Sequence, residues 1–168
     1  MIATKSHVKR TFKVYLDSNN TASFSGAQFN ATYPIDLTHI IFDEDAYDKS
    51  YLMYVNFQSA YGTPAVTTIN NNLVYTLHVD MGKGLNVFQY RQVKNPSAVL
   101  QLYYDGTNVG WNTVETDNMP TFVQNIRNMN AITINVIDTS TNSTFNSADN
   151  GAINTATKYV CCLTFVEA

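Results

Sequence analysis

The feature that most constrains the fold is an alternation of apolar and polar residues with a period of two, which returns in segment after segment. In the stretches "FKVYL" and "YLMYVNF" every second residue is apolar or aromatic, and helical spacing of apolar residues is nearly absent from the chain. Side chains of a β-strand alternate between two faces, so this pattern is typical of strands that are buried on one side. The sequence therefore predicts an all-β protein.

The alternation occurs in eight segments, and the apolar residues of each segment predict the face that points inward. In chain order the predicted inward residues are Phe12, Val14 and Leu16; Phe29, Ala31 and Tyr33; Tyr51, Met53, Val55 and Phe57; Leu73, Tyr75, Leu77 and Val79; Ala98, Leu100, Leu102 and Tyr104; Phe122, Gln124 and Ile126; Ile132, Ile134 and Val136; and Tyr159, Cys161, Leu163 and Phe165. A further strand is expected at 85–90, and one short helix within 36–50.

Eight half-buried strands in 168 residues require two packed antiparallel sheets. The jelly roll is the eight-stranded member of this class, and an immunoglobulin-like sandwich, which usually needs fewer residues, ranks second. We predict an antiparallel β-sandwich, a single jelly-roll domain over residues 11–168, preceded by a basic arm over residues 1–10. The polar segment 139–157 is expected to form a long exposed loop.

Charge is sparse and unevenly placed. Charged residues make up 14% of the chain, while 20 Asn and 20 Thr supply neutral polarity, and the net charge of -3 makes nucleic-acid binding by bulk electrostatics an unlikely function. The first cations, Lys5, Lys9, Arg10 and Lys13, all precede the first acid, Asp17. We expect these four basic residues to contact a neighbouring protein subunit, and the alternative is a solvated terminus.

The sequence contains few residues in patterns typical of catalysis or metal binding. His7, His39 and His78 lack the clustered spacing of a metal site. Cys161 and Cys162 are adjacent, which disfavours a disulfide between them, and Cys161 shares the apolar face of its strand. We therefore predict reduced cysteines, core packing for Cys161, and no catalytic, cofactor-binding or metal-binding residues.

Other short motifs are equally weak. The acidic run "FDEDAYDKS" lacks the spacing of an EF-hand, so a solvated acidic loop is expected there, one that a basic arm could reach. The Gly-x-Gly of "MGKGLN" is not a nucleotide fingerprint. Asn19, Asn30 and Asn142 stand in glycosylation sequons, which are frequent by chance in so Asn- and Thr-rich a chain. Neither a signal peptide nor a membrane span is predicted.

Both ends of the chain resemble the small jelly-roll capsid proteins of large double-stranded DNA viruses and their virophages. The similar segments are "YLDSNN", "AQFNATYPI" and "YLMYVNFQSAYGTP" near the start, and "ITINVIDTSTN" and "YVCCLTFVEA" near the end. The segment "NNTASFSG" departs from that group's pattern, which leaves the family member open. The resemblance implies a non-enzymatic subunit of an icosahedral capsid, with a penton role slightly favoured over a minor (cement) capsid role.

The same resemblance implies a location in the virion, synthesis inside the host cell rather than secretion, no cofactor, and partners that are copies of the chain itself and other capsid proteins, above all a major capsid protein. The competing class is a carbohydrate-binding β-sandwich, such as a host-attachment or lectin-like domain. In that interpretation Tyr104 and Trp111, in the loop "YYDGTNVGWN", stack on a glycan. A cupin-like enzyme ranks third because its metal ligands are missing.

Overall fold

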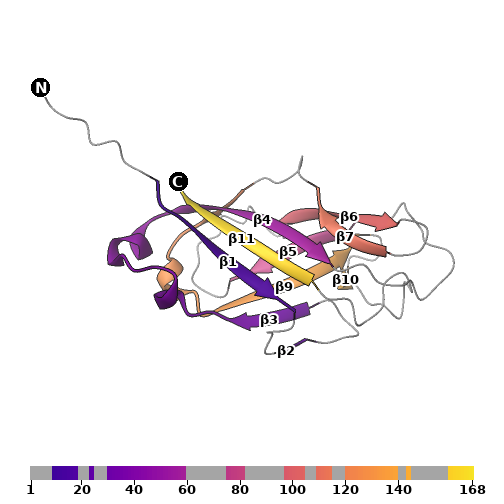
Figure 1. Cartoon of the computed structure of the whole chain (residues 1–168), viewed down its shortest axis with the longest axis horizontal. Helices are drawn as coiled ribbons and strands as arrows, with labels where there is room; N and C mark the ends of the chain where they lie inside the picture. Colours follow the sequence, from indigo (N-terminus) through magenta and orange to yellow (C-terminus); the bar gives the residue numbers. More distant parts are fainter. Residues whose placement is uncertain are drawn as a thin grey trace, which may run out of the picture.

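The computed structural model describes residues 9–18, 23–24, 30–59, 75–81, 97–104, 109–114, 120–139, 143–144 and 159–168, and these form strands with a group of 3₁₀ turns at one end (Figure 1). The strands are β1 (Thr11–Asp17), β2 (Ser23–Phe24), β3 (Asn30–Pro34), β4 (Tyr51–Ser59), β5 (Tyr75–Asp80), β6 (Ala98–Tyr104), β7 (Val109–Thr113), β8 (Thr121–Val123), β9 (Ala131–Asp138), β10 (Ser143–Thr144) and β11 (Tyr159–Glu167). The 3₁₀ helices are η1 (Leu37–His39), η2 (Glu44–Asp48) and η4 (Ile126–Asn128).

Strands pair in a nested order, from the two ends of the chain inward. β1 pairs with β11, β3 with β9, β4 with β8, and β5 with β6, every pair antiparallel. The β11–β4 and β9–β5 pairs then join these hairpin-like units side by side. Nested antiparallel pairs rolled into two sheets are the arrangement of a jelly roll, so the predicted fold class is confirmed.

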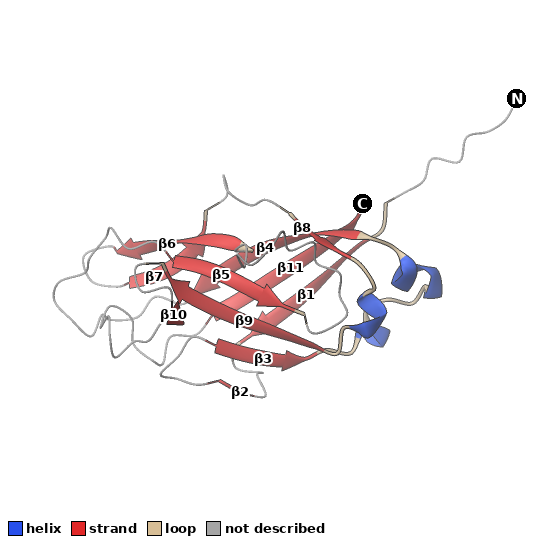
Figure 2. Ribbon diagram, turned by 180° about the vertical axis from the view of Figure 1, so that it is seen from behind, coloured by secondary structure: helices blue, strands red, loops and turns tan. Residues whose placement is uncertain are grey.

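Two sheets result, lying one behind the other (Figures 1 and 2). The first contains β1, β11, β4 and β8, and the second contains β3, β9, β5 and β6. β7 connects them, because it pairs with β6 along its length and meets β4 at Gln58 and Asn112. One hydrogen-bonded path therefore runs from β1 to β2 through both sheets.

The core lies between the sheets, and most of its residues are those that the alternation selected. The described residues of the predicted inward faces are buried in β3, β4, β9 and β11, and in β1 the exception is Phe12, which is half-buried against Phe165. In β5, Tyr75 and Leu77 are fully buried and Val79 is partly buried. Phe29, Leu73 and the predicted strand at 85–90 lie outside the described residues, as do the side chains of Leu102 and Tyr104.

The predicted face of the sixth strand is wrong. Phe122, Gln124 and Ile126 do not share one buried face, because β8 ends at Val123, and it is Val123 that points inward. Asn125 has a φ of 55°, and this left-handed conformation ends the extended backbone. Ile126 reaches the core from the following turn, η4.

The segment 36–50, where one short helix was expected, forms the two 3₁₀ helices η1 and η2. An aspartate begins each of them: the carboxylate of Asp36 accepts from the amide of Thr38 at 2.9 Å, and that of Asp43 accepts from the amide of Asp45 at 3.1 Å. Such side-chain acceptors satisfy the first donors of a turn and favour short turns over strand. Part of the acidic run therefore caps local structure.

Candidate interaction surface

The outer side of the first sheet is the surface most suited to contact with another protein. Because side chains alternate, the residues between the buried ones of β1, β11 and β4 all point away from the core. We call this surface the β1–β11–β4 face, and its members are Thr11, Lys13, Tyr15, Asp17, Leu52, Tyr54, Asn56, Gln58, Phe122 on β8, Val160, Cys162, Thr164 and Val166.

Apolar and aromatic side chains are prominent on this face. Tyr15 is 65% exposed and Val160 is 45% exposed, which makes them two of the three large hydrophobic residues that are exposed in the described part of the chain. Leu52 and Tyr54, on β4, are half-buried on the same face. Among the described residues of the face, the charges are confined to β1, the edge strand. A charge-poor surface with exposed aromatic and aliphatic groups is the composition found at the centres of protein interfaces.

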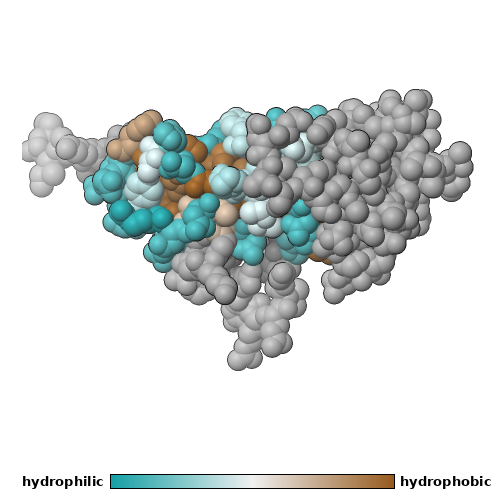
Figure 3. Space-filling model, turned by 90° about the horizontal axis from the view of Figure 1, so that it is seen from below, coloured by the Kyte–Doolittle hydropathy of each residue, from teal (hydrophilic) through white to brown (hydrophobic). Residues whose placement is uncertain are grey.

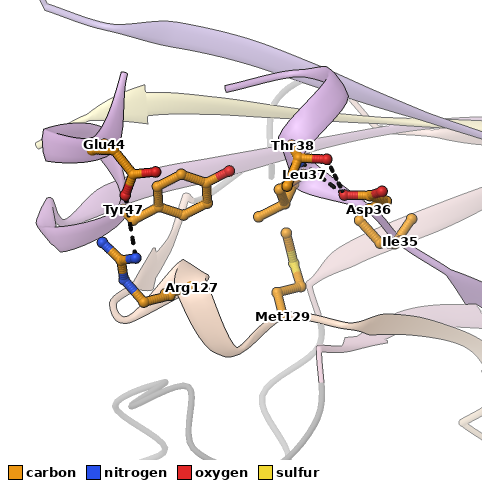
Figure 4. A pocket seen from close by; sticks show the side chains of 8 residues that line it. All are labelled: Ile35, Asp36, Leu37, Thr38, Glu44, Tyr47, Arg127 and Met129. Atoms are coloured by element: carbon orange, nitrogen blue, oxygen red, sulfur yellow. Dashed lines mark hydrogen bonds and ion pairs between the residues drawn. The ribbon is translucent and has the colours of Figure 1, made fainter. Parts of the chain in front are cut away.

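The helical end of the sandwich carries a second cluster. The guanidinium of Arg127 lies 5.0 Å from the ring centre of Tyr47, and its Nη1 atom is 3.3 Å from a carboxylate oxygen of Glu44 (Figure 4). Nearby Phe42 is 89% exposed. Seen from below in Figure 3, apolar surface ringed by hydrophilic residues lies in the half of the molecule that carries these turns.

A pocket of about 280 Å³ opens at this end. Its lining residues are Ile35, Asp36, Leu37, Thr38, Glu44, Tyr47, Arg127 and Met129 (Figure 4). The charged groups around it already have partners in the lining: Asp36 accepts from the Thr38 hydroxyl at 2.6 Å, and Arg127 contacts Glu44. The pocket therefore has an apolar floor and an internally satisfied rim, and no pair of groups in it is arranged for acid–base or nucleophilic chemistry.

The root of the basic arm is tied to the sandwich. The side chain of Arg10 donates to Asp43 at 2.6 Å from Nη2 and at 3.0 Å from Nε, and its Nη1 lies 3.5 Å from the carboxylate of Glu167. The backbone amide of Arg10 also donates to Glu167 at 3.1 Å. The hydrogen bond from Arg10 holds the pKa of the Asp43 carboxyl below its usual value, and the same bond raises the pKa of Arg10.

The four predicted basic contact residues thus occupy different environments. Lys5 lies outside the described residues, Lys9 is exposed, and Lys13 is exposed on β1. Arg10 is engaged within its own chain, with the acidic loop that the sequence suggested as a target for a basic arm. That these residues contact another subunit stays a prediction, and the structure places Lys13 at the edge of the β1–β11–β4 face.

Trp111 does not fit the glycan-stacking alternative. It is 0% exposed on β7, its ring centre lies 5.2 Å from that of Tyr75, and the Ser59 hydroxyl accepts from its backbone amide at 2.7 Å. A buried ring offers no platform to a sugar, because stacking requires an open face. The side chain of Tyr104 lies outside what the structure describes, so the alternative loses the residue on which it chiefly depended.

The thiols and histidines show no reactive arrangement in the described ranges. Cys161 is 0% exposed, as predicted for a core residue, and burial raises the pKa of its thiol. The imidazole of His78 is hydrogen-bonded to the Thr76 hydroxyl at 3.0 Å on the outer side of the second sheet. His, Cys, Asp and Glu form no group able to hold a metal within the residues that the structure describes.

Sequence reasoning missed the β1–β11–β4 face as a surface, although its signal was present. The positions between the inward residues include Tyr15, Leu52, Tyr54 and Val160, which are not the polar residues typical of a solvated sheet face. Across the described ranges, no helix has the length and apolar character needed to cross a membrane. Comparison with family models, curated proteins and solved structures found no match to this chain.

Proposed function

We propose that this chain is a non-enzymatic structural subunit of an icosahedral viral capsid, a penton or minor capsid protein that acts through contacts with copies of itself and with other capsid proteins. The proposal is supported by the resemblance of both chain ends to small viral jelly-roll proteins and by the jelly-roll pairing itself. Because one fold hosts many functions, the fold alone does not identify the function. Support for a structural role therefore has to come from the molecular surface.

The single observation that carries the proposal is the composition of the β1–β11–β4 face. Tyr15, on the edge strand β1, and Val160, on the neighbouring β11, stand exposed on an outer sheet face, where a monomer usually places polar residues. Burying them against a partner removes apolar area from water, and few charges on the face have to be desolvated in the process. A subunit whose work is done by contact needs such a surface, and a catalyst does not.

The basic arm supplies a second element of the proposal. Arg10 is bound to Asp43, at the start of the acidic turn η2. In this proposal Lys5 and Lys9 contact an acidic surface of a neighbouring subunit. A penton role is favoured over a cement role on the ground that the chain is predicted to be one domain, and a closed ring requires only one heterologous contact repeated around an axis.

Sedimentation velocity and electron microscopy of the purified protein test the proposal. The expected result is a defined oligomer that Val160→Asp disrupts, because this substitution replaces an exposed apolar side chain of the β1–β11–β4 face with a charge. The matched control is Gln101→Asp, which places the same charge at an exposed position of the second sheet and should leave assembly intact.

One truncated variant addresses the arm. A chain that begins at Lys9 retains Arg10 and its ion pairs, so weaker assembly of this chain would assign the contact to residues 1–8.

A wild-type protein that stays monomeric and binds a glycan tightly would contradict the capsid role. Oligomers that tolerate Val160→Asp and Gln101→Asp equally would remove the β1–β11–β4 face from the proposal.

A further inference from the structure

β1 is the last strand of its sheet, and its outer edge has no neighbour among the described strands. It extends over Thr11–Asp17, and Tyr15 on it is 65% exposed. An edge strand of this length displays backbone donors and acceptors that another strand can pair with, and soluble proteins usually protect such edges.

Two hydrogen bonds establish which backbone groups point outward. The amide of Glu167 donates to the carbonyl of Arg10 at 2.8 Å, and the amide of Ser18 donates to the carbonyl of Tyr159 at 3.1 Å. Both pairs continue the register of β1 with β11. In an antiparallel ladder, residues bonded to the partner alternate with residues whose N–H and C=O point away.

Arg10 and Ser18 face β11, and so do the even-numbered residues between them. It follows that Thr11, Lys13, Tyr15 and Asp17 direct their amides and carbonyls toward the open edge. These are the same residues whose side chains lie on the β1–β11–β4 face. Three of these outward-facing residues follow one another along the edge: the cation Lys13, the aromatic residue Tyr15 and the anion Asp17.

We propose that β1 pairs antiparallel with β1 of a second copy of this chain, about a two-fold axis at Tyr15. In this register Tyr15 lies opposite Tyr15 of the other copy, and Lys13 lies opposite Asp17, once on each side of the axis. All of these residues present outward backbone groups, so each opposed pair exchanges two backbone hydrogen bonds. Opposite charges on directly facing residues stabilise the pair, as do facing aromatic rings.

The charges also select the register and the partner. A pair centred on Lys13 would place two cations opposite each other, and one centred on Asp17 would place two anions opposite each other, both unfavourable. Asp17 already takes part in an interaction within the single chain. An ionised carboxylate can accept hydrogen bonds from more than one donor, so this interaction does not prevent a contact with Lys13 of the second copy. A strand of its own sequence complements this edge, and the inference stands independently of the capsid role.

Charge reversal tests this pairing on the full chain. Lys13→Glu brings a carboxylate opposite Asp17, and Asp17→Lys brings an ammonium opposite Lys13, so each single variant should dimerise about tenfold more weakly or worse. The double variant Lys13→Glu/Asp17→Lys restores opposite charges and should recover dimerisation. Lys49→Glu carries the same change of charge away from this edge and serves as the control. Analytical ultracentrifugation over a concentration series measures all of them.

Hydrogen exchange identifies the contact independently of charge. The amides of Lys13 and Tyr15 should exchange slowly only when the protein is dimeric, while those of Val14 and Leu16, which face β11, should be protected at every concentration. Tyr15→Pro removes an outward amide and should abolish the dimer without unfolding the sheet, as thermal unfolding will show. A protein that is monomeric at high concentration, a dimer whose edge amides exchange freely, or one indifferent to both single reversals would overturn the proposal.

Discussion

The outer sides of the two sheets are built on the same plan and present different chemistry. The β1–β11–β4 face carries exposed Tyr15 and Val160. The outer side of the second sheet carries hydroxyl and imidazole groups that bond to one another, such as Thr32 with Thr133 at 2.9 Å and Thr76 with His78 at 3.0 Å. Several polar groups of the second surface are thus bonded within the chain, whereas the first surface exposes apolar groups to solvent. This difference is the reason why the proposed contact is placed on the β1–β11–β4 face.

The largest expected effect concerns the core on which both faces rest. Trp111→Ala should lower the free energy of unfolding by about 3–5 kcal/mol, because the ring is fully buried against Tyr75. Urea unfolding followed by far-ultraviolet circular dichroism measures it. Tyr15→Ala, at a 65% exposed position, is the surface control and should change stability by about 0.5 kcal/mol or less. Equal effects of the two substitutions would contradict the burial of Trp111.

A second prediction tests the bond that links the sheets. The hydroxyl of Tyr33, on β3, donates to the hydroxyl of Tyr159, on β11, at 2.7 Å in the core. Burial raises the pKa of Tyr33 to about 12 and also raises that of Tyr159. The unfolded chain therefore loses these protons first, and the stability that they provide is complete below pH 10.0 and is lost as the pH rises toward 12.

Equilibrium unfolding at a series of alkaline pH values measures this loss. The double variant Tyr33→Phe/Tyr159→Phe should be less sensitive to pH above 10.0, since it lacks both raised pKa values. At neutral pH, Tyr33→Phe alone should cost about 1–3 kcal/mol, because it leaves the Tyr159 hydroxyl buried without this partner. A double variant that loses stability as steeply as the wild type would show that other groups govern the alkaline transition.

The third prediction compares the faces directly through one matched substitution. Thr133→Val removes the hydrogen bond with Thr32 on the second sheet and should cost about 0.5–1.5 kcal/mol. Thr164→Val, on the β1–β11–β4 face, disrupts only a long contact of 3.9 Å with Cys162 and should change stability by about 0.5 kcal/mol or less. Thermal unfolding measures both. If both substitutions lower the free energy of unfolding equally, the hydrogen bonds within the second face contribute no more to stability than those within the first.

The smallest expected effect is the acid response of the pair Arg10–Asp43. The pKa of Asp43 is held below 3.8 by the hydrogen bond from Arg10, so the stability that the pair provides is present above pH 3.8 and is lost as the pH falls through the lowered value. Both groups are open to solvent and the effect is small. Asp43→Asn should reduce the pH dependence of the melting temperature in acid, and an unchanged dependence would indicate that Asp43 is not engaged in solution.

The inward faces of the strands were predictable because they follow from local alternation. In β4, β9 and β11 each predicted inward residue is buried, since a period of two decides the face without any knowledge of the partner strand. The prediction failed at Phe122 and Gln124, which are only half-buried, because the buried residue of this strand is Val123. Ile126 is buried as predicted, but from the turn η4 that follows Asn125, whose left-handed conformation the alternation does not reveal.

The candidate surface could be predicted only in part, because its position depends on the order of the strands. Tyr15 and Val160 are far apart in the sequence and come together because β1 pairs with β11. The burial of Trp111 likewise requires β7 to close the gap between the two sheets, which no short stretch of sequence encodes.

Taken alone, the sequence determined the fold class, the inward faces and the scarcity of charge, all of which are local or compositional properties. Only the tertiary structure decided that Arg10 bonds to Asp43 and Glu167 of its own chain, that β1 stands at an open edge, and that apolar residues gather on one outer face. The physical reason is that these features arise from pairings between strands at opposite ends of the chain, such as β1 with β11, and long-range pairing is set by the packing of the whole core.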